Sequence, residues 1–189
     1  MIYFTSDTHF GQERTLQLSK RPFTCVEEMD RIMIANWNSI VKYDDEIVFH
    51  LGDFGNYEVA KQLNGDIYLI LGNYERKDIE EGKISIDELQ YKYGFKVIGD
   101  GDKNTYKIPE SLRLLDPEAQ PLNIQLQHEP SKCDKNMFNL FGHIHGRQMV
   151  KRFGLDVGVD CHHFRPIPLK DVLFYKEAIE KHYDEEVFL

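Results

Sequence analysis

The sequence predicts an α/β fold in which short strands alternate with helices and pair in parallel. Three apolar runs, residues 2–4, 47–51 and 67–71, are bounded by polar residues or glycine and are typical of buried strands. Residues 22–41 and 56–63 connect these runs and have helical character. Because helical crossovers join parallel strands, we expect the three strands to form one parallel sheet.

The first connection carries a clear helix signal. Thr24 is the expected N-cap, and Glu27, three residues later, is expected to complete a capping box. Apolar residues then recur at helical spacing and predict a stripe that packs against the sheet as core rather than as a cofactor pocket. The stripe consists of Val26, Met29, Ile32, Met33, Trp37 and Ile40.

The second half of the chain predicts a further set of short elements. Strands are expected at residues 96–98, 122–126, 140–141 and 155–159, and helical spacing interrupted by Gly82 covers residues 79–93. The alternation of apolar and polar residues in 122–126 predicts a half-buried strand. A closing helix is expected at 170–182, with Val172, Leu173 and Ile179 facing inward.

Two segments of this half are expected to lack regular structure. Residues 99–102, Gly-Asp-Gly-Asp, resemble part of a calcium loop, but the later ligands and the closing glutamate are missing. We therefore interpret them as a hairpin turn. Residues 116–121 are polar and end at a proline, which predicts a loop.

The composition is that of one globular domain spanning residues 1–189. Apolar residues make up 41% of the chain and charged residues 29%, which are ordinary values. The formal net charge of −9 argues against a general nucleic-acid or membrane binder, because such proteins depend on a basic surface.

The cysteines and the N-terminus bear on the compartment. Cys25, Cys133 and Cys161 are far apart and odd in number, which predicts no disulfide framework. No apolar run approaches membrane-spanning length, and the first residues do not show a basic region followed by an apolar one. We expect a cytoplasmic protein that does not act at a membrane.

Polar side chains follow the ends of the expected strands and form the strongest functional signal. They are Asp7, His9, Asp53, Asn73, His128, His143 and His145. The carboxyl ends of parallel strands meet at the edge of a sheet where ligands bind. Oxygen and nitrogen ligands without thiolates suit manganese, iron, nickel or zinc better than calcium. Seven ligands are too many for one tetrahedral ion, but they suit two divalent ions that share Asp53.

This ordered series resembles the calcineurin-like metallophosphoesterase superfamily. The matching motifs are Asp-x-His at 7–9, Gly-Asp at 52–53, Gly-Asn at 72–73, His128 and Gly-His-x-His at 142–145. The segments 6–11, 21–23 and 158–160 further resemble a small branch of predicted phosphoesterases that is common in bacteria and phages. The resemblance implies a sandwich of two central β-sheets flanked by helices.

The resemblance also implies a ligand set and a reaction. One ion would be held by Asp7, His9, Asp53 and His145, and the other by Asp53, Asn73, His128 and His143. Two ions about 3.5–4 Å apart can activate a bridging water and hold the phosphoryl oxygens during in-line attack. The implied protein is a metal-dependent phosphoesterase that acts on small phosphorylated substrates, with phosphodiesters or nucleotides favoured.

One position departs from the superfamily pattern. A histidine usually follows the asparagine and protonates the leaving group or stabilises the transition state, whereas this chain has Tyr74. A phenol is a weaker acid than an imidazolium, although two nearby cations would strengthen it. The alternative is that Tyr74 only packs over the site. Asn73, whose amide N–H group is free to reach a substrate, and Tyr74 are the candidate catalytic residues.

Three further histidines are candidates for a metal or substrate contact, and each also has a structural explanation. His50 lies inside a strand and is expected to face the core or a neighbouring helix rather than a metal. His162 and His163 follow Asp160 and Cys161 near the closing motif, so they either contact substrate or are structural. The structural alternative is favoured because the seven-ligand set is complete without them.

Two other functions stay open on the sequence alone. The superfamily includes DNA-repair nucleases, but the acidic balance and the absence of a basic, aromatic-interleaved surface disfavour nucleic acid as the substrate. A scaffold that has lost catalysis would show degraded ligand positions, and here every position is filled. Arg14, Arg76 and Arg165 are candidate phosphate contacts, although single arginines on loops are usually solvated.

Overall fold

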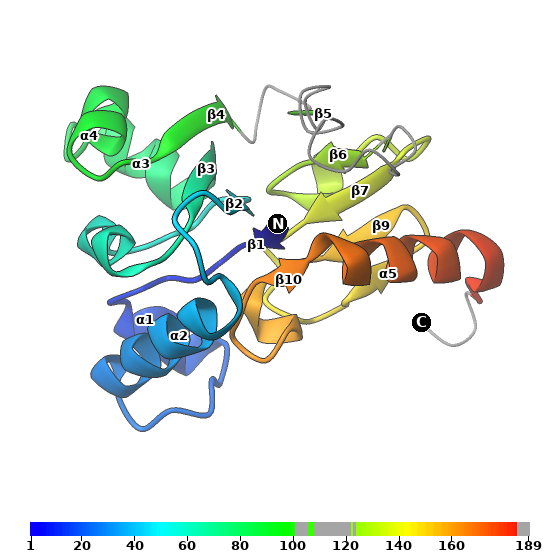
Figure 1. Cartoon of the computed structure of the whole chain (residues 1–189), viewed down its shortest axis with the longest axis horizontal. Helices are drawn as coiled ribbons and strands as arrows, with labels where there is room; N and C mark the ends of the chain where they lie inside the picture. Colours follow the sequence, from blue (N-terminus) through cyan, green and yellow to red (C-terminus); the bar gives the residue numbers. More distant parts are fainter. Residues whose placement is uncertain (101–105, 108–121, 123, 185–189) are drawn as a thin grey trace.

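The computed structural model describes residues 1–100, 106–107, 122 and 124–184. These residues form two mixed β-sheets flanked by helices, as Figure 1 shows. The strand order is β10-β1-β2-β3-β4 in the first sheet and β5-β6-β7-β9-β8 in the second. The α/β class and the two-sheet arrangement expected from the sequence are therefore confirmed. The loop expected at 116–121 lies outside the described residues.

The first sheet contains the three strands that the sequence predicted in its first half. Its strands are β1 (Ile2–Thr5), β2 (Ile47–His50), β3 (Asp66–Leu71), β4 (Lys96–Asp100) and β10 (Ile167–Pro168). The first four run parallel, and β10 pairs antiparallel with β1. Because Thr5 pairs with His50 and His50 with Leu69, the chain leaves β1, β2 and β3 at the same edge.

The second sheet is built from the C-terminal half. Its strands are β5 (Tyr106–Lys107), β6 (Ile124–Leu126), β7 (Phe138–Phe141), β8 (Val150–Lys151) and β9 (Gly154–Asp156). β6, β7 and β9 are parallel, and β5 and β8 pair antiparallel at the two sides. The prediction that β6 is half-buried was wrong. Gln125 is buried, and its Oε1 accepts a hydrogen bond from the Asp134 N–H at 2.9 Å, which gives that oxygen a partner inside.

In the described part of the chain, five α-helices and three short 3-10 helices surround these sheets. They are α1 (Glu13–Leu18), α2 (Val26–Ile40), α3 (Asn73–Glu80), α4 (Ile86–Tyr91), α5 (Leu169–His182), η1 (Tyr57–Gln62), η3 (Pro130–Lys132) and η4 (Val159–Cys161). Gly82, with a φ of +69°, lies between α3 and α4, so the interruption seen in the sequence separates two helices. Among the described residues, no helix is long and apolar enough to cross a membrane.

The start of α2 differs from the prediction by one residue. The N-cap is Cys25 rather than Thr24, and its side chain makes no capping hydrogen bond. Glu28 therefore occupies the third helical position, where an acidic side chain reaches back. Its Oε2 accepts hydrogen bonds from the N–H and the hydroxyl of Thr24, both at 2.7 Å. Glu27 does not complete the capping box that the sequence suggested.

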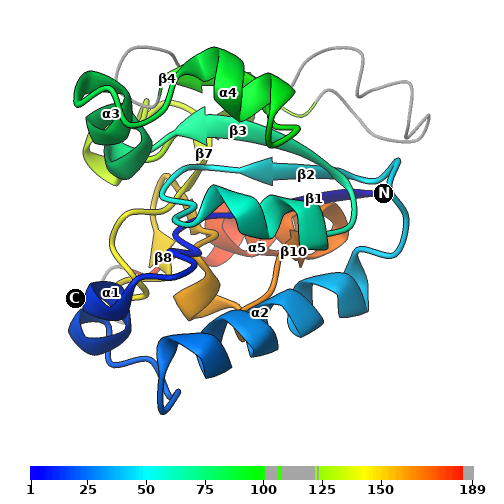
Figure 2. The ribbon, with the colours of Figure 1, turned by 90° about the vertical axis from the view of Figure 1, so that its left-hand side faces the viewer.

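The first sheet separates two hydrophobic cores. Tyr3 and Val48 face α2 and pack with Trp37 of its apolar stripe, while Phe4 and Phe49 face the second sheet. Figure 2 shows α2 running along the first sheet, and Figure 1 shows α5 beside β9. Alternation along each strand thus fills both cores.

The inward face predicted for α5 is only partly buried. Val172 and Ile179 of α5 are buried in the core between the sheets as predicted, whereas Leu173 is only half-buried. Residues 99–100, expected to begin a hairpin turn, extend β4 instead, and the other half of that turn lies outside the described residues. The three cysteines are free thiols.

Candidate metal centre

The seven predicted ligand residues meet where the strands of both sheets end. Asp7 and His9 follow β1, Asp53 follows β2 and Asn73 begins α3 directly after β3. The second sheet supplies the others, with His128 following β6 and His143 and His145 following β7. Their atoms form two groups whose ligand atoms lie within 4.8 Å of one another, Asp7 with His9 and His145, and Asp53 with His128 and His143.

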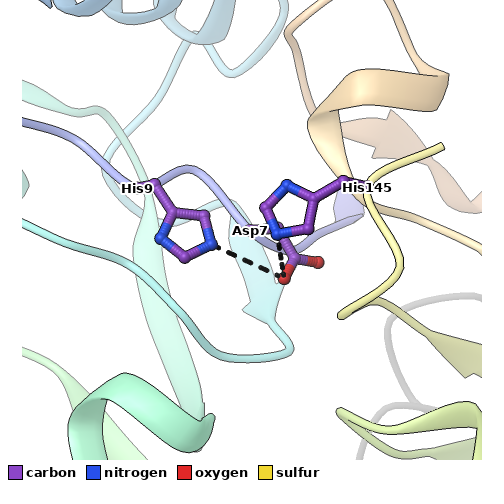
Figure 3. A group of neighbouring side chains, drawn as sticks. All are labelled: Asp7, His9 and His145. Atoms are coloured by element: carbon purple, nitrogen blue, oxygen red, sulfur yellow. Dashed lines mark ion pairs between the residues drawn. The ribbon is translucent and has the colours of Figure 1, made fainter. Parts of the chain in front are cut away.

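The first group is drawn in Figure 3, with both imidazoles directed at one carboxylate. Asp7 Oδ1 lies 3.9 Å from Nε2 of His9 and 4.0 Å from Nε2 of His145. Asp7 and His9 are buried, yet within the described structure Asp7 Oδ1 and His9 Nε2 have no hydrogen-bond partner. Burying polar atoms without partners is costly, so this arrangement fits a cation held between them.

The second group surrounds the amide oxygen of Asn73. Asn73 Oδ1 lies 2.9 Å from His128 Nε2 and 3.1 Å from His143 Nδ1. Asp53 Oδ2 lies 3.5 Å from His128 Nε2 and 3.6 Å from His9 Nε2, so this carboxylate faces both groups. The sequence assigned Asp53 to both ions, and the geometry is compatible with that assignment.

Three of the histidines are oriented by an acceptor on the far side of the ring. Each places Nδ1 against an oxygen, which leaves Nε2 directed into the cluster. Metal-ligating histidines in proteins commonly show this arrangement. The acceptors are Gln12 Oε1 at 2.7 Å for His9, the Leu51 carbonyl at 2.7 Å for His128 and Asp160 Oδ2 at 3.3 Å for His145.

Arg21 holds together the loops that carry the first group. Its side chain is fully buried, and Nε and Nη2 donate to the two carboxylate oxygens of Asp160 at 2.9 and 2.8 Å. The same guanidinium donates to the carbonyls of Asp7 at 2.6 Å and Thr8 at 2.8 Å. Burial alone would raise the pKa of Asp160, but His145 and Arg21 outweigh it and lower the pKa to about 2. Arg21 thereby fixes both the Asp7 loop and the partner of His145.

Glu75 has the corresponding role beneath the second group. This fully buried carboxylate accepts hydrogen bonds from the N–H groups of Asp53 and Gly72, both at 2.8 Å, and of Phe54 at 2.7 Å. Burial and then the charge of Asp53 raise its pKa to about 7, although the three N–H donors oppose this. Glu75 therefore anchors the turn that presents Asp53.

His50 faces the interior, as the sequence suggested. Its Nδ1 accepts from the Gly52 N–H at 3.2 Å, so Nε2 carries the proton and donates to the Thr8 hydroxyl at 3.0 Å. That hydroxyl in turn donates to the Phe54 carbonyl at 2.8 Å. Burial lowers the pKa of His50 to about 3, so the ring is neutral at pH 7 and serves to brace the loops after β1 and β2.

The backbone of the cluster is unusual. Five of the seven candidate ligands have φ angles in the left-handed region, where residues other than glycine are uncommon. They are Asp7, His9, Asp53, His143 and His145, with φ between 48° and 73°. Gly52 has a φ of +105°, and a Cβ there would lie 2.5 Å from Gly72 Cα, so only glycine lets β2 and β3 end this close together. Such strained residues gather at functional sites.

The carboxylate of Asp53 and the imidazole of His128 stabilise each other's charged form. Burial disfavours charge on both, but their mutual attraction outweighs it. As a result the pKa of Asp53 is lowered to about 2 and that of His128 is raised to about 9. A cation entering at neutral pH would therefore displace a proton from His128.

Tyr74 lies beside the cluster without joining it. Its backbone N–H donates to Asp53 Oδ1 at 2.9 Å, and its ring meets the His9 ring edge-on with centroids 4.9 Å apart. The side chain is half-buried and lines a cleft of about 610 Å³ that opens over both groups. The position of the Tyr74 ring fits both roles considered above, that of a proton donor and that of a packing group over the site.

The remaining candidates from the sequence lie apart from the ligand cluster. His162 is buried, and its Nε2 pairs with the Asp156 carbonyl at 2.7 Å, which fits the structural role favoured above. His163 and Arg165 line a separate cavity of about 440 Å³. Arg76 pairs with Glu129 at 3.2 Å. Arg14 alone of the three candidate arginines lines the cleft.

Several residues that shape the site were missed by the sequence analysis. Gln12, Arg21, Glu75 and Asp160 contact ligands or their loops through single side chains. Arg21 and Asp160 lie in segments that carried the resemblance, which is the one signal that could have pointed to them. For Gln12 and Glu75 the sequence offers no distinguishing pattern.

Comparison with known proteins identifies a shared fold. No protein-family model matches the chain. An uncharacterised protein of Methanocaldococcus jannaschii is 40% identical over 83 residues, which cover 40% of this chain and 47% of that protein, so the chain matches about half the length of this relative. A solved structure of a protein of unknown function from Aquifex aeolicus has a TM-score of 0.63 at 20% identity, over 93% of this chain and 98% of that chain. That similarity establishes the two-sheet α/β fold.

Proposed function

We propose that this chain is a two-metal phosphoesterase that resembles the calcineurin-like metallophosphoesterase superfamily in fold and mechanism. The observation that carries the proposal is the ring of seven nitrogen and oxygen donors, of which Asp7, His9, Asp53 and His128 are buried. Within it, Asp7 Oδ1 and His9 Nε2 lack any partner in the described structure. The two-sheet fold and the order of the ligands along the chain support the same proposal.

The residues present fit two divalent ions. Asp7, His9 and His145 would hold one, Asn73, His128 and His143 the other, and Asp53 would contribute to both. When bound, such ions supply Lewis acidity toward phosphoryl oxygens and a nucleophilic water at neutral pH. The mixed donor set without thiolates favours manganese, iron, nickel or zinc.

The chain's own groups position the substrate. Asn73 directs its Oδ1 at the cluster, and its side-chain N–H group would donate to a phosphate bound above. Buried His9 and Asp53 line the cleft, together with the more exposed His143 and Tyr74. We expect the reacting phosphorus to lie in this cleft, whose volume of about 610 Å³ has room for a small phosphodiester or nucleotide.

Metal removal tests the donor ring. Saturating Mn²⁺ at about a hundred times its dissociation constant should add about 2.7 kcal/mol of stability. For a chain of this length that is a rise of roughly 5–10 °C in melting temperature. The comparison is thermal unfolding of the Mn²⁺-loaded protein before and after EDTA treatment, with metal content measured on both samples. An unchanged melting temperature after verified metal loss would contradict a tight site.

Turnover tests the reaction itself. The Mn²⁺-loaded protein should hydrolyse bis-p-nitrophenyl phosphate, and EDTA should abolish the activity until Mn²⁺ is returned. A protein that binds metal tightly yet leaves phosphodiesters, phosphomonoesters and single-stranded DNA intact would be a metal-binding scaffold instead.

Tyr74 determines which leaving groups are tolerated. Because a phenol is a weaker acid than an imidazolium, the wild-type protein should favour aryl esters, whose leaving groups need little protonation. Tyr74→His should increase turnover of alkyl esters on the order of 10-fold and change aryl esters little. The measurement is the rate across a phosphodiester series for the Tyr74, His and Phe proteins. If all three depend equally on the acidity of the leaving group, position 74 does not donate a proton.

A further inference from the structure

The cleft above the candidate ligands is basic, although the chain is acidic. Four of its lining residues, Arg14, Lys20, Lys77 and Arg147, carry a positive charge, and one, Asp53, carries a negative charge. The formal net charge of the whole chain is −9. Positive potential is therefore concentrated at this cleft, where it attracts an anion.

The four cations reach the cleft from three sides. Arg14 belongs to α1 and Lys20 follows the end of that helix, Lys77 belongs to α3, and Arg147 lies between β7 and β8. All four residues are exposed, so they surround the mouth rather than the buried floor. An anion held by these four residues would lie nearer to the solvent than the reacting phosphate, which is proposed to bind over the seven donors.

Three of these cations lack an internal partner. Lys77 lies 3.9 Å from Glu81, but Arg14, Lys20 and Arg147 form no ion pair or side-chain hydrogen bond within the part of the chain described. Three exposed lysines elsewhere, by contrast, are paired on the surface: Lys61 with Glu58, Lys96 with Asp66 and Lys181 with Glu177. The charges at the cleft are therefore available to a ligand.

The cleft also has an apolar wall between the cations. Leu18 is 62% exposed and lines the cleft together with Tyr74 and Ile144. An exposed leucine and an aromatic ring in the same cleft offer apolar surface for the flat or apolar part of a ligand. A ligand that combines two anionic groups with such a part would use the whole cleft.

We propose that the substrate carries a second phosphate besides the one that reacts, as a nucleoside bisphosphate does, and that Arg14, Lys20 and Arg147 bind this second phosphate. The inference rests on the proposed function for the position of the reacting phosphate. A small molecule fits better than a nucleic acid, because a long polyanion requires an extended basic track, whereas these four cations surround a single cleft.

Equilibrium binding tests the second phosphate independently of turnover. By titration calorimetry of the Mn²⁺-loaded protein at low salt, thymidine 3′,5′-bisphosphate should bind at least about tenfold more tightly than thymidine 5′-monophosphate. The triple variant Arg14→Gln, Lys20→Gln, Arg147→Gln should bring this ratio close to one. The matched control Lys61→Gln, Lys96→Gln, Lys181→Gln removes the same charge elsewhere and should preserve the ratio.

The outcomes separate the two proposals. A ratio near one in the wild-type protein, or an equal loss in the control variant, overturns the second-phosphate site whether or not phosphodiesters are hydrolysed. If the wild-type protein binds the bisphosphate about tenfold more tightly but hydrolyses no phosphate ester, the second-phosphate site is supported and the proposed reaction is overturned. When turnover is present, thymidine 5′-(p-nitrophenyl phosphate) should show a lower KM with a 3′-phosphate than without it.

Discussion

Asp53→Asn is expected to remove bound metal from both groups and to lower phosphodiester turnover on the order of 100-fold or more. Asp53 Oδ2 lies within 3.6 Å of imidazole nitrogens in both groups, whereas the imidazole nitrogens near Asp7 Oδ1 among the described residues, those of His9 and His145, belong to the first group. An amide has the same shape but no charge, so the substitution weakens two coordination spheres at once. Asp7→Asn weakens one, and it should retain more metal.

Metal content per chain, measured after gel filtration, checks this order. Asp66→Asn is the matched control, since Asp66 begins β3 at the end away from the cluster, is only half-buried and pairs with Lys96. It should leave metal content and turnover unchanged. Full occupancy of both sites in Asp53→Asn would rule out a shared carboxylate.

Arg21→Met is expected to lower the free energy of unfolding by about 3–5 kcal/mol. The substitution leaves Asp160 largely buried without its guanidinium and frees two backbone carbonyls of the Asp7 loop. It should also weaken metal binding about 10–100-fold, because Asp160 orients His145. Denaturant unfolding with and without Mn²⁺ measures both effects.

Two further variants separate charge from geometry at Arg21. Arg21→Lys keeps the charge but loses the planar fork that contacts both oxygens of Asp160, so it should be intermediate. The double variant Arg21→Met, Asp160→Asn removes the unpaired charge. It should lower the free energy of unfolding by less than the sum of the losses in the two single variants. A loss below about 1 kcal/mol in Arg21→Met would show that the pair does not hold these loops.

The parts of the fold that the sequence predicted are those encoded over a few residues. Runs such as 47–51 and 67–71 place strands by their own composition, and the polar residues directly after them mark the shared edge. The seven candidate ligands could be named for the same reason, since each is attached to a strand end. The α2 N-cap was misplaced because Thr24 and Glu28 bond to each other one position away from the usual spacing.

The parts that could not be predicted depend on contacts between distant residues. Gln125 alternates with apolar neighbours and seemed solvent-facing, but the backbone of Asp134 offers it a partner inside. The pairing of Arg21 with Asp160 joins residues 139 positions apart, and nothing near either residue indicates it. Burial of Glu75 likewise depends on the N–H groups of Asp53 and Phe54 in the loop after β2, which only the folded chain brings to the start of α3.

The division of the donors between the two sheets gives the site a place in the order of folding. Asp7, His9, Asp53 and Asn73 leave the first sheet, and the three other histidines leave the second. Neither sheet carries all the donors of either proposed ion site, so tight binding of the proposed ions would require the docking of one sheet on the other. Contacts of such long sequence separation form slowly. The rate at which tight Mn²⁺ binding appears during refolding would therefore report the rate at which the interface between the two sheets forms.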